Sequence, residues 1–279
     1  MRTLLTTGLL FLLVNSVSAQ QRPLVTEDPE TVGEGQVLIE AGLDYSRDVT
    51  YPVSGLTGNL RRMPLVGVSI GIGSIAEIQV DGGLWNHLAI VERSPAPLAD
   101  LLDVSGTDTS SIEDIVVGTK VLVVPESASR PGIGLRIATK LPLASNESGL
   151  GLDTTDFFLS ILGAKTVESV RIVSNVGLAL LGDATRGNQQ SRLLTYGVSF
   201  ARATTQTTEV VGELNGRAFL GGDDPTPGAE SRSMFRFGAR HTRGTIRADA
   251  ALLFGLTTND PSFGVTAGVT YVFNAFQTP

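Results

Sequence analysis

Apolar residues alternate with small or polar residues through most of the chain, and this alternation constrains the fold more than any other feature. Between Phe263 and Phe273, every second residue is apolar, and the residues between them are mostly glycine and threonine. A period of two is typical of a β-strand whose two faces meet different surroundings. Twelve such segments can be recognised, at residues 36–48, 64–73, 75–85, 114–123, 132–141, 156–165, 170–181, 192–201, 208–217, 233–240, 245–255 and 263–273.

The connections between these segments indicate how the strands are arranged. Tight turns are expected at 73–74, 166–169, 204–206 and 242–244, and longer loops at 49–59, 92–111, 143–155, 182–190 and 218–230. Alternating short and long connections are typical of outer-membrane barrels, whose strands of about 9–11 residues cross the bilayer.

We therefore predict an all-β, transmembrane up-and-down antiparallel β-barrel of about 12 strands over residues 36–273. Its apolar face would contact lipid, and its Gly-rich, sparsely charged face would line the lumen. The alternative is a secreted β-sandwich or a lipocalin-like barrel, because these folds also use a period of two.

The two ends of the chain carry further signals. Arg2, an apolar run at 4–14 and the small-residue pattern ending at Ala19 predict a signal peptide over residues 1–19 that is cleaved on export. Residues 20–35 are polar and rich in Pro and Gly, so they are expected to be either a periplasmic lead-in or a segment inside the lumen. Residues 274–279 form a C-terminal extension. The predicted location is the cell outer membrane.

Composition and motifs argue against several classes of function. The chain has 21 Lys and Arg against 28 Asp and Glu, a net charge of −7, which argues against nucleic acid as a partner. There is no cysteine, and neither His87 nor His241 lies in a nucleophile or metal-ligand motif. We therefore expect no enzyme, no cofactor and no metal. The expected partners are outer-membrane lipid and lipopolysaccharide, the barrel-assembly machinery and a small-molecule solute.

The candidate functional residues are the charged residues on the lumen face. They are Glu40, Asp44, Glu77, Asp81, Lys120, Arg136, Lys140, Arg171, Glu213, Arg217, Arg236, Arg240, Arg247 and Asp249. They could form a charged constriction that orients and filters small solutes. Alternatively they pair across neighbouring strands, Glu213 with Arg236 for instance, and fill the barrel, because buried charges must be paired. Both arrangements predict the same alternation.

Several segments resemble one family of outer-membrane proteins. "RPLVTEDPETVGEGQVLIEAGLDY" (22–45), "ATKLPLASNESGLGLDTTDFFLSILGAK" (138–165), "EVVGELNGR" (209–217) and "FGVTAGVTYVF" (263–273) are similar to the MetA-pathway phenol-degradation family. The resemblance implies an outer-membrane barrel with a transport function, associated with the breakdown of aromatic compounds. It supplies no established site residues. The chain departs from the usual barrel ending because residues 274–279 follow Phe273.

The sequence therefore predicts passive transport of small solutes, aromatic or hydrophobic ones included. The alternative is a closed structural or surface-interaction barrel that acts through its external loops.

Overall fold

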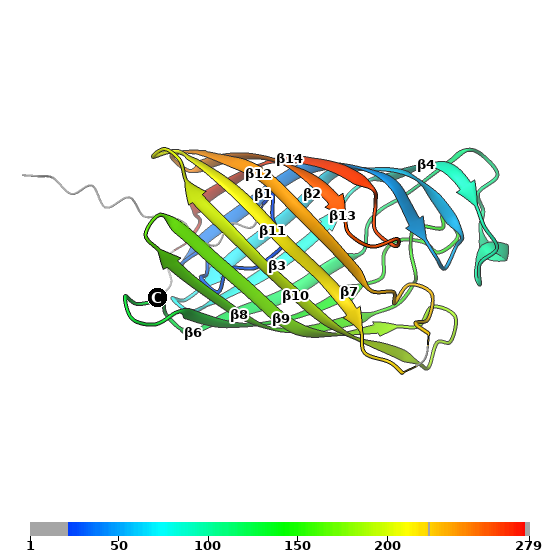
Figure 1. Cartoon of the computed structure of the whole chain (residues 1–279), viewed down its shortest axis with the longest axis horizontal. Helices are drawn as coiled ribbons and strands as arrows, with labels where there is room; N and C mark the ends of the chain where they lie inside the picture. Colours follow the sequence, from blue (N-terminus) through cyan, green and yellow to red (C-terminus); the bar gives the residue numbers. More distant parts are fainter. Residues whose placement is uncertain (1–21, 223, 277–279) are drawn as a thin grey trace, which may run out of the picture.

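The structure is a computed structural model that describes residues 22–222 and 224–276, and its strands close into a barrel (Figure 1). The predicted signal peptide and the last three residues of the C-terminal extension lie outside the described residues. No helix in the described part of the chain is long and apolar enough to cross a membrane. The elements are β1 (Gln36–Tyr51), β2 (Leu56–Ile72), β3 (Ala76–Gly83), β4 (Asn86–Arg93), the 3-10 helix η1 (Ala99–Leu101), β5 (Asp108–Ser111), β6 (Ile115–Val124), β7 (Gly132–Leu141), β8 (Asp156–Val167), β9 (Val170–Gly182), β10 (Gln190–Ala203), β11 (Thr208–Phe219), β12 (Arg232–Arg243), β13 (Ile246–Gly255) and β14 (Phe263–Asn274).

Antiparallel pairing between the first and last strands closes the barrel. β1 pairs with β2 on one side and with β14 on the other, in an unbroken register from Gln36↔Asn274 to Arg47↔Phe263. β3 and β4 pair with successive parts of β2, one after the other. On their other sides, β3 pairs with β6 and β4 pairs with β5. The closed ring therefore has twelve strands, and the predicted architecture is confirmed.

Burial is the reverse of what a water-soluble protein shows. Large apolar side chains on the outer face are exposed, for example Ile137 at 63% and Ile161 at 53%, whereas the inward-facing Glu77 and Lys120 are 0% exposed. A soluble monomer rarely exposes a continuous apolar surface of this extent. Lipid around the barrel accounts for both faces, because the apolar band then contacts acyl chains and the polar face is enclosed.

Two predicted loops are partly strand. β5 (Asp108–Ser111) lies inside the predicted loop 92–111, and neither β5 nor β4 (Asn86–Arg93) is among the twelve predicted segments. Residues 49–59 were expected to form a long connection, but β1 and β2 stay paired at Thr50↔Thr57 and Tyr51↔Leu56, so that only residues 52–55 join them. Pro52 and Gly55 do lie in this short turn. Gly58 and Asn59 also look like loop residues in the sequence, but they lie in β2, where the neighbouring strands β1 and β4 hold them in the sheet. With β4 and β5, these ends of β1 and β2 extend the wall at the end of the barrel opposite the C-terminus (Figure 1).

The inside–outside assignment predicts the effect of a charge on the outer face. Val269, exposed near the middle of β14, should tolerate leucine but not arginine, and Val269→Arg should cost about 2–4 kcal/mol in a bilayer. Urea unfolding of the protein refolded into lipid vesicles measures this difference. Equal stabilities for Val269→Arg and Val269→Leu would show that this face does not contact lipid.

Candidate functional site

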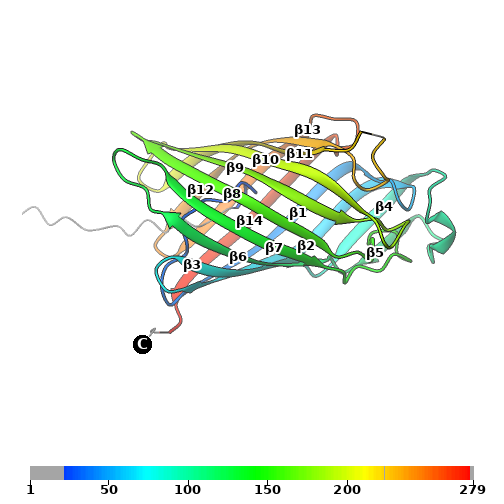
Figure 2. The ribbon, with the colours of Figure 1, turned by 90° about the horizontal axis from the view of Figure 1, so that it is seen from below.

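The N-terminal segment of the described chain, residues 22–35, runs inside the barrel (Figures 1 and 2), and we call it the lumenal segment. Most of its residues are buried, including Thr26, Glu27 and Asp28, and they contact side chains of strands on several sides of the wall. Of the two alternatives for this part of the sequence, the structure therefore shows a segment inside the lumen.

Arg22 fixes the start of the lumenal segment against β13 and β14. Its Nη2 atom donates hydrogen bonds of 2.9 Å to Thr266 Oγ1 and to the carbonyl of Ala267, and lies 3.6 Å from a carboxylate oxygen of Asp249. Gly42 and Gly268, which pair across β1 and β14, leave the space for this guanidinium. A Cβ atom at either glycine would lie within 2.5 Å of an Arg22 side-chain atom.

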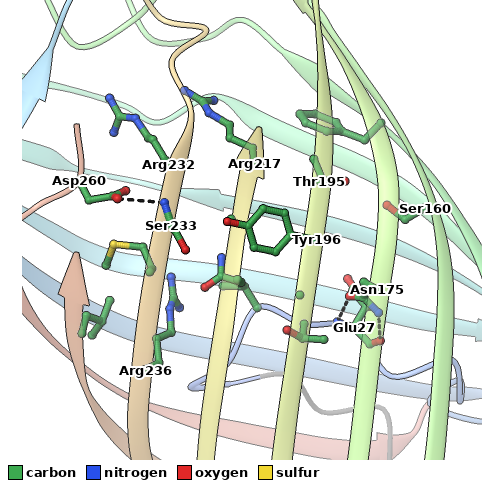
Figure 3. A pocket seen from close by; sticks show the side chains of 18 of the residues that line it. Glu27, Ser160, Asn175, Thr195, Tyr196, Arg217, Arg232, Ser233, Arg236 and Asp260 are labelled. Atoms are coloured by element: carbon green, nitrogen blue, oxygen red, sulfur yellow. Dashed lines mark hydrogen bonds between the residues drawn. The ribbon is translucent and has the colours of Figure 1, made fainter. Parts of the chain in front are cut away.

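Side chains of the wall satisfy the backbone of the lumenal segment. The Glu213 carboxylate accepts hydrogen bonds from the N–H groups of Val25 (2.9 Å) and Thr26 (2.6 Å). Asn175 accepts from the N–H of Glu27 (2.6 Å) and donates to its carbonyl (2.8 Å), as the dashed lines of Figure 3 show. Unpaired backbone groups are costly when buried, so these contacts allow an irregular segment to lie in the lumen.

A buried ion-pair network anchors the middle of the lumenal segment. The Glu27 carboxylate lies 3.4 Å from Lys120 Nζ and 3.0 Å from Arg136 Nε. Lys120 also contacts Glu77 at 3.0 Å, and the second oxygen of Glu77 accepts a hydrogen bond from the N–H of Val32 at 2.7 Å. Charges this deeply buried persist only when they are paired.

A second network reaches the turn between β6 and β7. The Arg171 guanidinium donates to Asp28 of the lumenal segment (Nη2–Oδ1, 2.7 Å) and to Glu126 of that turn (2.7 Å). Burial alone would raise the pKa of the Glu126 carboxyl, but hydrogen bonds from the Thr166 N–H and from Arg171 outweigh it, so the pKa lies below its ordinary value. Glu126 therefore stays ionised and helps to hold Arg171 beside Asp28.

The other predicted lumen residues mostly pair with one another or with neighbours on the wall. Glu40 accepts a hydrogen bond from Thr270, and Asp81 lies 4.0 Å from Arg136. The ion pairs are Asp44 with Arg62, Lys140 with Asp114 and Asp156, Arg240 and Arg247 with Glu209, and Arg236 with Glu213. The pair suggested from the sequence, Glu213 with Arg236, is 3.6 Å apart. Four further residues contribute to the lumen without being among the predicted ones, because nothing in their own strands or segment marks them: Arg22, Arg62, Asn175 and Arg232.

Beyond the lumenal segment, toward the long loops, the lumen contains a cavity of about 480 Å³ (Figure 3), which we call the arginine cavity. Residues 25–27 form part of its lining. Its charged lining is mainly basic, with Arg62, Arg136, Arg217, Arg232 and Arg236. A second cavity of about 400 Å³ shares Phe158, Arg217 and Arg232 with it and is also lined by the loops at 149–152 and 226–229.

No protein-family model matches the chain, and no curated protein matches it. Solved structures do match. The NanC porin shares 8% identity at a TM-score of 0.51, with 84% of this chain and 98% of that one covered. The translocator domain of the autotransporter NalP from Neisseria meningitidis shares 14% at 0.48, with 85% and 88% covered, and the Pseudomonas putida toluene transporter TodX 10% at 0.40, with 86% and 89% covered. Such a likeness shows the fold alone, that of an outer-membrane β-barrel. The MetA-pathway family is not confirmed.

The expectation that the chain is not an enzyme is contradicted by the comparison with solved structures. The solved barrels similar to this chain include outer-membrane enzymes, LpxR from Salmonella typhimurium among them.

The position of Arg22 beside Gly42 and Gly268 predicts a substitution that should release the lumenal segment from the wall. Gly42→Leu places a side chain where the guanidinium lies, so the segment should lose its contacts with Asp249 and Thr266. Digestion of the folded barrel by a glutamate-specific protease, followed by mass spectrometry, should then show faster cleavage after Glu27. The control is Gly187→Leu, because a Cβ there meets open space. Equal protection in both variants would show that Arg22 does not hold the segment.

Proposed function

We propose that this protein carries small solutes passively across the outer membrane, with the lumenal segment as a plug. The observation that carries the proposal is the arginine cavity of about 480 Å³ inside the closed wall. Protein interiors are close-packed and contain few voids larger than a water molecule. A barrel whose only task is structural has no need of such a space, whereas a transport barrel does.

The contacts of the lumenal segment suit a plug that can be displaced. Its buried apolar contacts are few: Leu24 packs against Ala201 and Val211, and Val32 against Leu38 and Val272. Pro29 is also fully buried, beside Gly132 and Gly134 of β7. Many of the remaining contacts are hydrogen bonds and ion pairs, and a neutral hydrogen bond exchanges with water at a modest net free energy of about 0.5–1.5 kcal/mol. Lys120 keeps Glu77 as a partner when Glu27 leaves, so the wall does not depend on the segment for that charge.

The apolar outer face supports a location in the outer membrane, in contact with lipid and lipopolysaccharide. Export through the cleaved leader and insertion by the barrel-assembly machinery belong to the same proposal. Membership of the MetA-pathway family would agree with it.

The prediction of aromatic or hydrophobic solutes stays a prediction. The charged lining of the lumen favours a solute with polar groups over a hydrocarbon. TodX is a toluene transporter by name, but its TM-score of 0.40 is too low to bear on the solute of this chain.

A specific observation also supports the alternative of a surface-interaction barrel. The extension built by β1, β2, β4 and β5 carries the loop at 94–107 and exposed apolar side chains such as Val91 and Leu101. Under this alternative, point changes in the loop would abolish a binding phenotype and leave permeability unchanged.

Single-channel conductance in a planar bilayer tests the transport proposal. The refolded mature protein should show small or rare conductance steps, and a variant lacking residues 22–33 should show larger and more frequent ones, because the polar lumen is then cleared. Arg192→Gln, a change to an exposed side chain on β10, is the control for handling and insertion. If both the mature protein and the deletion variant are silent while heat-modifiable migration shows folded barrels, the transport proposal fails.

A further inference from the structure

The arginines of the arginine cavity are not equally compensated. Three of them have acidic partners: Arg62 has Asp44 and Glu113, Arg136 has Glu27 and Asp81, and Arg236 has Glu213. Arg217 and Arg232 form no ion pair with any residue in the described part of the chain. The carboxylates of Glu230, Asp156 and Asp260 are near Arg217 without pairing with it, and Asp260 also lines the cavity. Five arginines against two carboxylates, Glu27 and Asp260, make the lining cationic within a chain whose net charge is −7.

These two arginines lie directly opposite each other on β11 and β12 (Figure 3). Like charges at opposed positions of a sheet are destabilising, so a pair of this kind calls for an explanation. Their hydrogen bonds within the described structure are to backbone carbonyls: Arg217 donates to Glu230 (3.1 Å) and Gly228 (2.9 Å), and Arg232 to Thr50 (3.3 Å). Neutral carbonyls satisfy N–H groups but do not neutralise two positive charges.

Polar atoms without partners lie in the same place. The Nε atom of Arg232 and the Oδ1 atom of Asn215 are buried and have no hydrogen-bond partner in the structure. Both residues line the arginine cavity, together with Tyr196 and Ser233. The Nε atoms of Arg62 and Arg236, which line the same cavity, also have no hydrogen-bond partner in the described part of the chain. Buried polar groups are nearly always hydrogen-bonded, so these guanidinium nitrogens indicate a missing acceptor, and Asn215 Oδ1 indicates a missing donor.

The rest of the lining is mixed: it includes the carboxylates of Glu27 and Asp260, polar side chains such as Ser160 and Thr195, and apolar side chains. Phe158, Met234 and Leu253 line the cavity, and Phe158 also lines the second cavity nearer the loops. A cavity of about 480 Å³ lies within the range of about 300–1,000 Å³ that is usual for small-molecule sites. It therefore has room for an anionic group at the arginines and for an apolar body beside it.

We propose that Arg217 and Arg232 form a binding site for the carboxylate of a small organic anion with an apolar body, on the path of the transported solute. The proposal rests on the transport function and names its substrate class. Guanidinium groups are suited to this role because they remain charged and present their N–H groups in a fork that matches a carboxylate. The bound anion would neutralise the opposed pair, and its apolar part would contact Phe158 and Met234.

Isothermal titration calorimetry on the refolded full-length mature barrel in detergent tests this site without requiring an open pore. Benzoate is the probe, and benzyl alcohol is its neutral counterpart of similar shape. Benzoate should bind and benzyl alcohol should not. Arg217→Gln and Arg232→Gln should each weaken benzoate binding about ten-fold or more, as expected for the loss of a charge-assisted hydrogen bond.

The control variant is Arg192→Gln, because this arginine is exposed on β10 and does not line the cavity. It should bind benzoate as the unchanged protein does. Thermal unfolding of the two cavity variants should occur at the same or a higher temperature, because each removes a like-charge repulsion. A purely structural role for either arginine would lower that temperature instead.

Three outcomes overturn the proposal: no heat of benzoate binding, equal binding of benzoate and benzyl alcohol, or cavity variants that match Arg192→Gln. Binding of inorganic phosphate in place of benzoate would also refute the carboxylate class. If the barrel binds benzoate but never conducts, the binding site is supported and the transport function is refuted. If it conducts but does not bind benzoate, the transport function is supported and the binding site is refuted.

Discussion

Closure of the hydrogen-bonded ring between β1 and β14 is the constraint on which the rest of the structure depends. The bilayer core offers no water to an unpaired N–H or C=O group, so an open sheet edge cannot be placed there. The register from Gln36↔Asn274 to Arg47↔Phe263 removes both edges at once. Once the ring is closed, each strand has one face in lipid and one face in an enclosed space. Large apolar side chains are therefore exposed on the outside and charged side chains are buried inside, the opposite of a soluble protein.

The enclosed space brings a second requirement, because charges that face inward have little water around them and need partners. The lumenal segment supplies many of these partners and obtains its own from the wall. Glu213, Asn175 and Glu77 take the place of a neighbouring strand for its backbone. Arg22 occupies the space that Gly42 and Gly268 leave open. These two glycines of the inward face thus have a packing role.

The two halves of the lumen differ in what fills them and in how their charges are paired. The half nearest the short turns is occupied by the lumenal segment and its ion pairs, whereas the half nearest the long loops contains the arginine cavity. In the first half almost all inward-facing charges have a partner of opposite charge. In the second half Arg217 and Arg232 form no ion pair with a residue in the described part of the chain. This difference separates a region built for closure from one that has the charge and the space for a solute.

The sequence by itself determined the twelve strands of the closed ring and the direction of their faces, because alternation is a local property that each strand carries alone. It did not indicate β4 and β5. It did not determine that residues 49–51 and 56–59 stay in the sheet, since hydrogen bonds from a neighbouring strand decide this. Only the tertiary structure decided which inward charges meet. Arg22 and Thr266 are 244 residues apart, and no pattern within either segment marks the contact. Ring closure and the path of the lumenal segment bring them together, and these same features leave Arg217 and Arg232 beside a cavity and without an ion pair in the described part of the chain.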